Sequence, residues 1–200
     1  MTYSVLGLDQ SMTSTGWAHY RQGDEKPTWG LKTMPPWGDD EGKYLWEWFE
    51  WLGKLCTELK VTHLYIEDTR FSHKHEETLT QMIASIGLIG QAAIVAHLLT
   101  RRWQNVEFFS VSPRDWRGVF LGAFPKPGGI ADVAWRKMLK EAAVEQCLKR
   151  GWMISKDDES DALGIMTYGV CIVDPAFRNR QGALFRAAEK QVDDFVRENR

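Results

Sequence analysis

Residues Val5–Tyr20 read "VLGLDQSMTSTGWAHY", and the fold of the chain can be inferred outward from them. Its apolar run ends at Asp9, a small polar loop follows, and residues typical of a strand resume at Gly16. Two such runs joined by a short polar loop predict a β-hairpin. The hairpin would carry a carboxylate at the end of a buried strand, and the question is what that carboxylate does there.

Length and composition indicate one globular domain. The 200 residues can bury a substantial core, and 44% hydrophobic with 26% charged residues is ordinary for a soluble chain. No apolar run approaches the roughly 18 residues that span a bilayer, and no signal peptide opens the sequence. We expect a cytoplasmic protein without a membrane segment. Its three cysteines, Cys56, Cys147 and Cys171, lack metal-ligand spacing and are expected to be reduced core thiols.

The charge is unevenly distributed along the chain. The net charge is only −2, but residues 1–100 carry 8 Lys/Arg against 13 Asp/Glu. Residues 101–156 reverse this balance, with 11 Lys/Arg against 5 Asp/Glu. Such asymmetry can form one positive face that attracts nucleic acid, although a solvated helix face would have the same composition.

Hydrophobic periodicity predicts an α/β protein. Strands are expected over residues 3–9, 14–22, 28–34, 62–68 and 105–112. Helices are expected over residues 43–60, 76–101, 114–121, 131–150 and 158–173. Three sequential strands followed by alternating elements favour a mixed five-stranded sheet with helices on its faces. We assign residues 1–174 to this domain and residues 175–200 to a C-terminal helical tail.

Acidic residues follow two strands and open the last helix. Asp9 ends the first strand and Glu67 ends the fourth, where ligands bind in open α/β sheets. Asp158 and Asp161 are three residues apart, which places both on one helical face. Taken singly, Asp157 or Asp158 could be a helix N-cap, and Asp9 and Glu67 could be a loop-start and a solvent-facing acid.

Together these acids predict a metal site. Two neighbouring carboxylates repel each other by roughly 4 kcal/mol at an effective dielectric constant of 20, so a cluster needs cations or protons. At least one of them should therefore have a raised pKa in the metal-free protein. Oxygen-only ligands favour Mg²⁺ or Mn²⁺ over Zn²⁺, and two such ions suit phosphodiester hydrolysis.

Four motifs in this order, "LGLDQSMTSTGW", "LYIEDTRF", "MIASIGLIGQA" and "DDESDALG", resemble the RuvC family of Holliday junction resolvases over roughly residues 3–172. The resemblance implies an RNase H-like fold, whose mixed five-stranded sheet has its first three strands antiparallel and helices on both faces. It also implies a homodimer that nicks four-way DNA junctions in pairs, using two Mg²⁺ or Mn²⁺ ions per site. The compact form resembles a bacteriophage-type member.

The resemblance assigns roles to individual residues. Asp9, Glu67, Asp158 and Asp161 match the catalytic, metal-binding acids of the family. Where the family usually has Pro-Gly after the first acid, this chain has Gln10–Ser11. The family's wedge aromatic is matched by Phe71, one residue farther on, which could instead cover the core from a loop. Arg70 and Lys74 beside it would face DNA phosphate.

Further DNA-binding candidates lie in the basic segment: Arg114, Arg117, Lys126, Arg136, Lys137 and Lys140. The family places a basic residue near the scissile phosphate in this region, but the sequence does not single one out. For each of them a solvated surface charge is the alternative.

The sequence thus predicts a metal-dependent, structure-selective endonuclease acting on branched DNA, with paired nicking by a homodimer. The hairpin also resembles the first phosphate loop of sugar kinases and other actin-like ATPases, although no second phosphate loop is visible. A non-catalytic junction-binding protein on the same fold is the third possibility.

Overall fold

The computed structural model describes residues 2–38, 40–68, 79–101 and 105–177, with the side chains of residues 79–86 and 100 excluded. The chain divides into two compact units, Met1–Gly169 and Val170–Arg200. Most of the predicted C-terminal tail lies outside the described residues. Its helix and the boundary after residue 174 therefore stay predictions.

Five strands and five helices of the described residues follow the predicted order. The strands are β1 (Ser4–Gln10), β2 (Ser14–Arg21), β3 (Thr28–Thr33), β4 (His63–Glu67) and β5 (Glu107–Val111). The helices are α1 (Glu41–Glu58), α2 (Leu79–Arg101), α3 (Pro113–Phe120), α4 (Asp132–Lys149) and α5 (Asp157–Val173).

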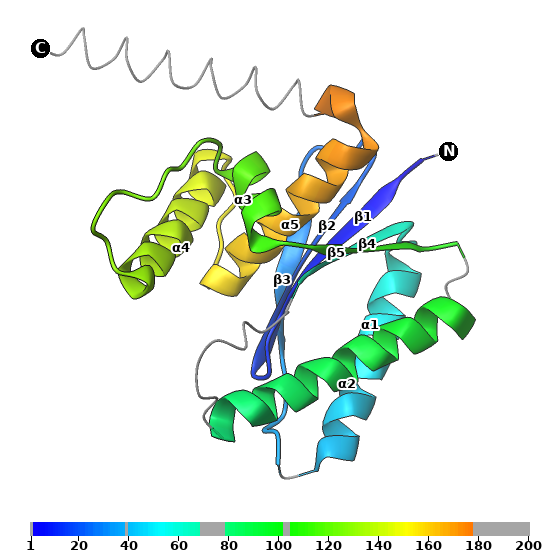
Figure 1. The fold of residues 1–200 in the computed structure, drawn as a ribbon. Helices are drawn as coiled ribbons and strands as arrows, with labels where there is room; N and C mark the ends of the chain where they lie inside the picture. The colour runs from blue at the N-terminus through cyan, green and yellow to red at the C-terminus, as the bar shows by residue number, and fades with distance from the viewer. Residues whose placement is uncertain (1, 39, 69–78, 102–104, 178–200) are drawn as a thin grey trace, which may run out of the picture. The chain divides into compact units, whose positions relative to one another are not determined.

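The strands form one sheet in the order β3-β2-β1-β4-β5 (Figure 1). The β1–β2 and β2–β3 pairs are antiparallel, whereas β4 and β5 continue the sheet parallel to β1. This arrangement confirms the predicted mixed five-stranded sheet with three antiparallel strands first. It also places the ends of β1 and β4 side by side, because Leu8 pairs with Ile66.

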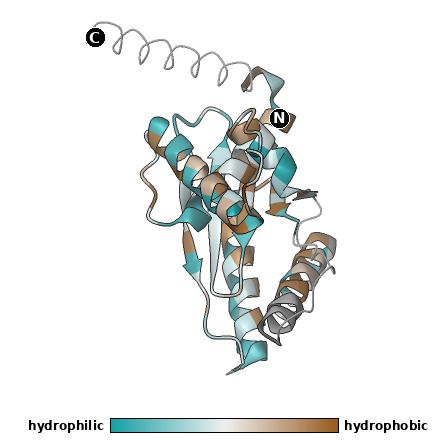
Figure 2. Ribbon diagram, turned by 60° about the vertical axis from the view of Figure 1, so that its left-hand side comes forward, coloured by the Kyte–Doolittle hydropathy of each residue, from teal (hydrophilic) through white to brown (hydrophobic). Residues whose placement is uncertain are grey.

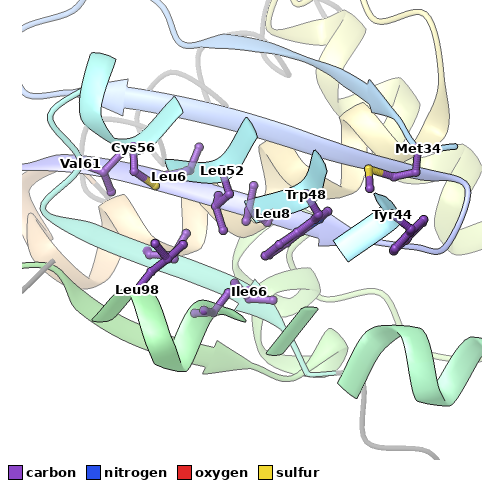
Figure 3. Packing of buried hydrophobic residues seen from close by; sticks show 12 residues of the cluster. Leu6, Leu8, Met34, Tyr44, Trp48, Leu52, Cys56, Val61, Ile66 and Leu98 are labelled. Atoms are coloured by element: carbon purple, nitrogen blue, oxygen red, sulfur yellow. The ribbon is translucent and has the colours of Figure 1, made fainter. Parts of the chain in front are cut away.

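One face of the sheet carries the main apolar core, against α1 and α2 (Figures 1 and 3). Leu6 and Leu8 of β1 point into it, with Ile66 of β4 beside them. Trp48 and Leu52 of α1 cover them and are fully buried. Each such apolar side chain contributes about 1.5–3 kcal/mol when it leaves water, so this layer fixes which face of β1 is inside.

Because side chains alternate along a strand, residues between those leucines point to the opposite face. Helix α5 packs there at very short range, and two glycines allow it. A Cβ atom on Gly7 would lie 2.8 Å from the Ala162 carbonyl oxygen and would overlap the Met166 nitrogen. A Cβ atom on Gly16 of β2 would overlap the backbone of Asp158.

Helix α1 is amphipathic, as its apolar spacing predicts. Asp40 caps it by accepting a hydrogen bond of 2.8 Å from the Lys43 nitrogen. Trp48 is fully buried, whereas Trp46 is 62% exposed and lies off the apolar stripe. Figure 2 shows hydrophilic and hydrophobic residues alternating around the helices, which is typical of elements with one buried face.

Two further sequence predictions concern cysteines and membranes. All three cysteines are free thiols, and burial raises the pKa of Cys56 and Cys147 to about 12. Cys56 and Cys147 are therefore inert core groups at neutral pH. Within the described segments, no helix combines the length and apolar character that crossing a bilayer would need.

Candidate active site

The candidate site begins at the neighbouring ends of β1 and β4. The parallel register aligns Leu8 with Ile66, so the next residues, Asp9 and Glu67, are also neighbours and share a face of the sheet. That face is opposite the leucine core and is the one covered by α5. Both side chains are half-buried. The sheet therefore brings two of the four predicted acids together.

The start of α5 brings the other two acids to the same place. Asp9 is paired across the hairpin with Gly16. The Asp158 backbone occupies the space that a side chain at Gly16 would fill. Asp161 follows one helical turn later on the side of α5 that faces the sheet. It is only 5% exposed. The close approach at Gly16 thus carries Asp158 and Asp161 to the strand ends.

The polar turn of the hairpin is tied to this site. The Ser14 hydroxyl donates a hydrogen bond to Asp158 Oδ2. Ser11 shapes the turn, because its nitrogen donates to the Ser14 carbonyl oxygen at 3.1 Å and its hydroxyl accepts from the Ser14 nitrogen at 3.1 Å. The amide of Gln10 donates to Gln91 of α2 at 3.1 Å. Gln10–Ser11, the departure from Pro-Gly, therefore builds a hydrogen-bonded turn beside the acids.

The alternative that Asp158 is only a helix cap does not fit its contacts. The backbone that precedes the helix is bound by Glu159, whose carboxylate accepts hydrogen bonds from the nitrogens of Ser155 at 2.6 Å and Lys156 at 3.1 Å. Asp157 has the lowered pKa of a first-turn acid, through a hydrogen bond from Lys140 and backbone hydrogen bonds at the start of the helix. Asp158 is left to face Ser14 and the strand ends.

The acids interact electrostatically, and three of them, Asp9, Glu67 and Asp161, have raised pKa values. Burial raises the pKa of Asp9 well above its usual value, and the charges of Asp161, Glu67 and Asp158 raise it further. Burial also raises the pKa of Asp161 to about 7, with Glu67 adding to the effect. The pKa of Glu67 is raised by burial too. Loss of water on burial contributes more to these raised pKa values than the repulsion between carboxylates does. The sequence predicts a raised pKa from the repulsion alone.

The donor set fits a hard divalent cation. It consists of carboxylates, and the Oδ1 oxygen of Asp161 is buried without a hydrogen-bond partner among the residues that the structure describes. A buried unpaired acceptor is costly and a cation would satisfy it. Within the same residues, no three His, Cys, Asp or Glu side chains stand as a ready-made metal-binding group.

Helix α3 supplies partners for two of the acids. The indole nitrogen of Trp116 donates a hydrogen bond of 2.7 Å to Glu67 Oε2. Arg117 Nη2 lies 3.7 Å from Asp161 Oδ2. The sequence alone indicates Arg117 only as a DNA-binding candidate and does not indicate Trp116 or Ser14 as site residues. Their site partners are 44 or more residues away in the chain, so no local pattern could identify them.

Of the four basic candidates Lys126, Arg136, Lys137 and Lys140, Lys140 of α4 is the one that interacts with the acids. Its ammonium donates a hydrogen bond of 2.6 Å to Asp157 Oδ2. Burial alone would lower its pKa, but this bond and the charges of Asp157, Asp161 and Asp158 raise it overall. The positive charge of Lys140 also lowers the pKa of Asp9 and Glu67. It is therefore an electrostatic member of the acid cluster.

The remaining DNA-binding candidates have other surroundings. Lys126 pairs with Asp132 at 2.6 Å, and Lys137 pairs with Glu141 at 3.8 Å, both on the surface. Arg136 is exposed on α4. Three candidates, Arg70, Phe71 and Lys74, lie outside the described residues.

A cleft of about 680 Å³ adjoins the site between α3 and α4. Arg114 and Arg117 line one side, and Phe124, Trp135 and Leu139 line the other. The rings of Phe124 and Trp135 stack, with their centroids 5.4 Å apart. Since Arg117 also contacts Asp161, the cleft opens beside the acids.

Comparison with known proteins places this geometry in a known fold. The structure matches Thermus thermophilus RuvC in complex with a Holliday junction substrate, with a TM-score of 0.58 and 12% identity over 90% of this chain and 96% of that chain. T. thermophilus RuvC alone gives a TM-score of 0.54 and 14% identity, with the same coverage. The yeast mitochondrial Holliday junction resolvase gives 0.53 and 14%, over 93% of this chain and 83% of that chain. No family model and no curated protein matches the sequence.

The fold is thus that of the RuvC-type Holliday junction resolvases, an α/β RNase H-like fold with a mixed five-stranded sheet. The resemblance drawn from four short motifs is confirmed at the level of fold. At 12–14% identity the match is one of architecture, and the chemistry has to be argued from this chain's own residues.

Proposed function

We propose that this chain is a divalent-metal-dependent endonuclease that cuts branched DNA, with the four-way junction as its substrate. The observation that carries the proposal is the convergence of Asp9, Glu67, Asp158 and Asp161 from three separate elements, with an unpartnered buried oxygen on Asp161. Evenly distributed surface acids would have neither the burial nor the raised pKa values of Asp9 and Asp161.

These four carboxylates would hold two Mg²⁺ or Mn²⁺ ions. Bound ions of this kind activate water and stabilise the leaving oxygen in phosphodiester hydrolysis. A ligating carboxylate is ionised, so the raised pKa values of Asp9 and Asp161 mean that metal binding competes with protons at these two groups. Ser14 orients Asp158 through its hydroxyl. Lys140 offsets part of the negative charge of these acids and would contact a DNA phosphate that approaches them.

The DNA path proposed here runs over the cleft beside the acids. Arg114 and Arg117, which line the cleft, would neutralise phosphates there, and Lys140 would do so beside the acids. A four-way junction has two-fold symmetry, and paired nicks need two sites, so we propose that the active form is a homodimer. The RuvC structure bound to a Holliday junction supports this choice of substrate through the shared fold.

The decisive experiment offers the protein a labelled four-way junction, a fork, a flap and a linear duplex, each with Mg²⁺, Mn²⁺ or EDTA. We expect paired nicks in the junction, dependent on metal and lost in Asp9→Asn and Asp161→Asn. The variant Lys137→Ala, which alters only an exposed ion pair, should cut normally. Metal-free junction binding without cleavage would indicate a non-catalytic junction-binding protein instead. Sedimentation analysis of the junction complex tests the homodimer.

A further inference from the structure

The chain path brings α3 directly against the acids. Glu67, the last residue of β4, pairs with Val111, the last residue of β5. Helix α3 begins two residues later, where Ser112 accepts a hydrogen bond of 3.2 Å from the Asp115 nitrogen and Pro113 occupies the first turn. The first turn of α3 therefore stands over the end of β4, and Trp116 comes from that turn.

Trp116 is held in one place. Its side chain is fully buried, and its indole nitrogen donates to Glu67 Oε2 at 2.7 Å. Gly164 of α5 makes room for the ring, because a Cβ atom there would lie 2.5 Å from Trp116 Cζ3. The Phe120 ring packs beside it, with a centroid distance of 6.4 Å. A ring fixed on these sides aims its N–H at one oxygen of Glu67.

Arg117 contacts Asp161, as Trp116 contacts Glu67. Its guanidinium carbon lies 4.8 Å from the centroid of the Trp116 ring, and its Nη2 atom lies 3.7 Å from Asp161 Oδ2. The Arg117 side chain is only 23% exposed. Two consecutive residues thus contact one oxygen each of two acids from different elements. The other oxygen of Asp161 is left without a partner among the described residues.

We propose that Trp116 and Arg117 are positioning residues that together orient the carboxylates of Glu67 and Asp161 for metal binding. The inference rests on the proposed function for its metal, but it concerns the orientation of two side chains and can be tested without DNA. Partners that orient metal-binding groups typically contribute 10-fold to 100-fold in metal affinity or activity.

The first test observes the indole N–H groups directly. The protein has ten tryptophans, so ¹⁵N-labelled protein should give ten indole signals, assigned by through-bond experiments. Trp48 is the matched control, because it is also fully buried but its indole nitrogen has no partner among the described residues. Adding Mg²⁺ should shift the Trp116 signal and leave the Trp48 signal in place. An unmoved Trp116 signal at saturating Mg²⁺ would overturn the proposal.

The second test compares Trp116→Phe with Trp48→Phe. Both changes keep an aromatic ring in the core, but only the first removes a hydrogen bond to an acid. Trp116→Phe should weaken Mn²⁺ binding 10-fold to 100-fold in calorimetry without DNA, and lower kcat for junction cleavage more than it changes KM. Trp48→Phe should leave both unchanged. Equal Mn²⁺ affinity in the two variants would contradict the proposal.

Arg117→Met tests the partner residue, with Arg114→Met as the control. Arg114 lines the same cleft but contacts neither acid, so only Arg117→Met should weaken Mn²⁺ binding. If Trp116→Phe does not fold, Gly164→Ala displaces the ring instead and should have the same effect on Mn²⁺ affinity. Metal binding with the expected variant effects but no DNA cleavage would reject the proposed function alone. Wild-type protein that binds neither ion would overturn both proposals.

Discussion

The Ser14 hydroxyl donates a hydrogen bond to Asp158 Oδ2 and so joins the first hairpin to a helix 144 residues later in the chain. The same hairpin carries Asp9, and its Gly16 makes room for the Asp158 backbone. The turn that follows the first acid is thus part of the site's framework, through contacts that are distant in sequence.

Removing this hydroxyl should loosen Asp158. Ser14→Ala is expected to weaken Mn²⁺ binding roughly 10-fold, because an unoriented carboxylate pays rotational entropy when it ligates an ion. Calorimetry of the DNA-free protein measures the effect. Ser4→Ala is the control, since Ser4 is also buried in β1 but bonds His19 at 2.7 Å, away from the acids. The same affinity loss in both variants would mean that general loosening of the β1–β2 hairpin is the cause.

The close packing of α5 on the sheet predicts an unusual sensitivity to one methyl group. Gly16→Ala should destabilise the protein by about 1–3 kcal/mol, because the methyl group overlaps the Asp158 backbone. It should also weaken metal binding, since it displaces two acids. Gly118→Ala on α3 meets open space and should stabilise the helix by up to about 1 kcal/mol. Chemical denaturation compares the two, and equal stability of both variants would contradict the packing.

The raised pKa of Asp161 predicts that the metal-free protein loses stability as pH rises. Its carboxyl titrates at about 7 when folded, against a usual value near 3.8. The unfolded chain therefore releases this proton at lower pH than the native protein does, and the stabilisation present below about pH 4 disappears progressively up to about pH 7. Asp161→Asn should reduce this dependence to the part that the raised pKa values of Asp9 and Glu67 contribute, and should stabilise the metal-free protein at pH 8 by on the order of 2–4 kcal/mol.

Denaturation at pH 5 and pH 8, without metal and with Mn²⁺, measures this effect. Mn²⁺ should restore the stability of the native protein at pH 8 and leave Asp161→Asn much less affected. A flat pH profile in the native protein would show that Asp161 is not held in a buried cluster.

Lys140 and Lys137 lie one turn apart on α4 and make a natural pair for testing DNA contacts. Lys140 faces the acids, whereas Lys137 is 79% exposed and pairs with Glu141. Lys140→Ala should weaken junction binding and reduce the slope of log affinity against log salt by about 1, as for one lost phosphate contact. Lys137→Ala should change little. Binding titrations with the labelled junction at roughly 50 to 200 mM salt distinguish the two variants.

Much of this arrangement follows from local sequence. The order of elements was predictable because apolar periodicity is a local property, and Asp9 and Glu67 were visible because each ends an apolar run. Asp158 and Asp161 were visible because a three-residue spacing places two side chains on one helix face. These features need no knowledge of what lies across the molecule.

The supporting contacts could not be predicted in that way. Trp116 was one tryptophan among ten, and its role depends on a register that aligns β4 with β5. Lys140 was one of several basic residues, and only the packing of α4 near α5 distinguishes it. One signal was available: Gly7 inside a buried strand indicates the close approach of another backbone, and here that backbone is α5.

The alternation of β1 also limits which changes of length the chain could accept. Leu6 and Leu8 face the core, while Gly7 and Asp9 face α5. Deleting or inserting a single residue between Leu6 and Asp9 would turn the carboxylate toward Trp48 and a leucine toward the acids. This short segment can therefore accept the substitution of one apolar residue for another. Its number of residues is fixed, because inserting or deleting one residue would disrupt the apolar core and the acid cluster together.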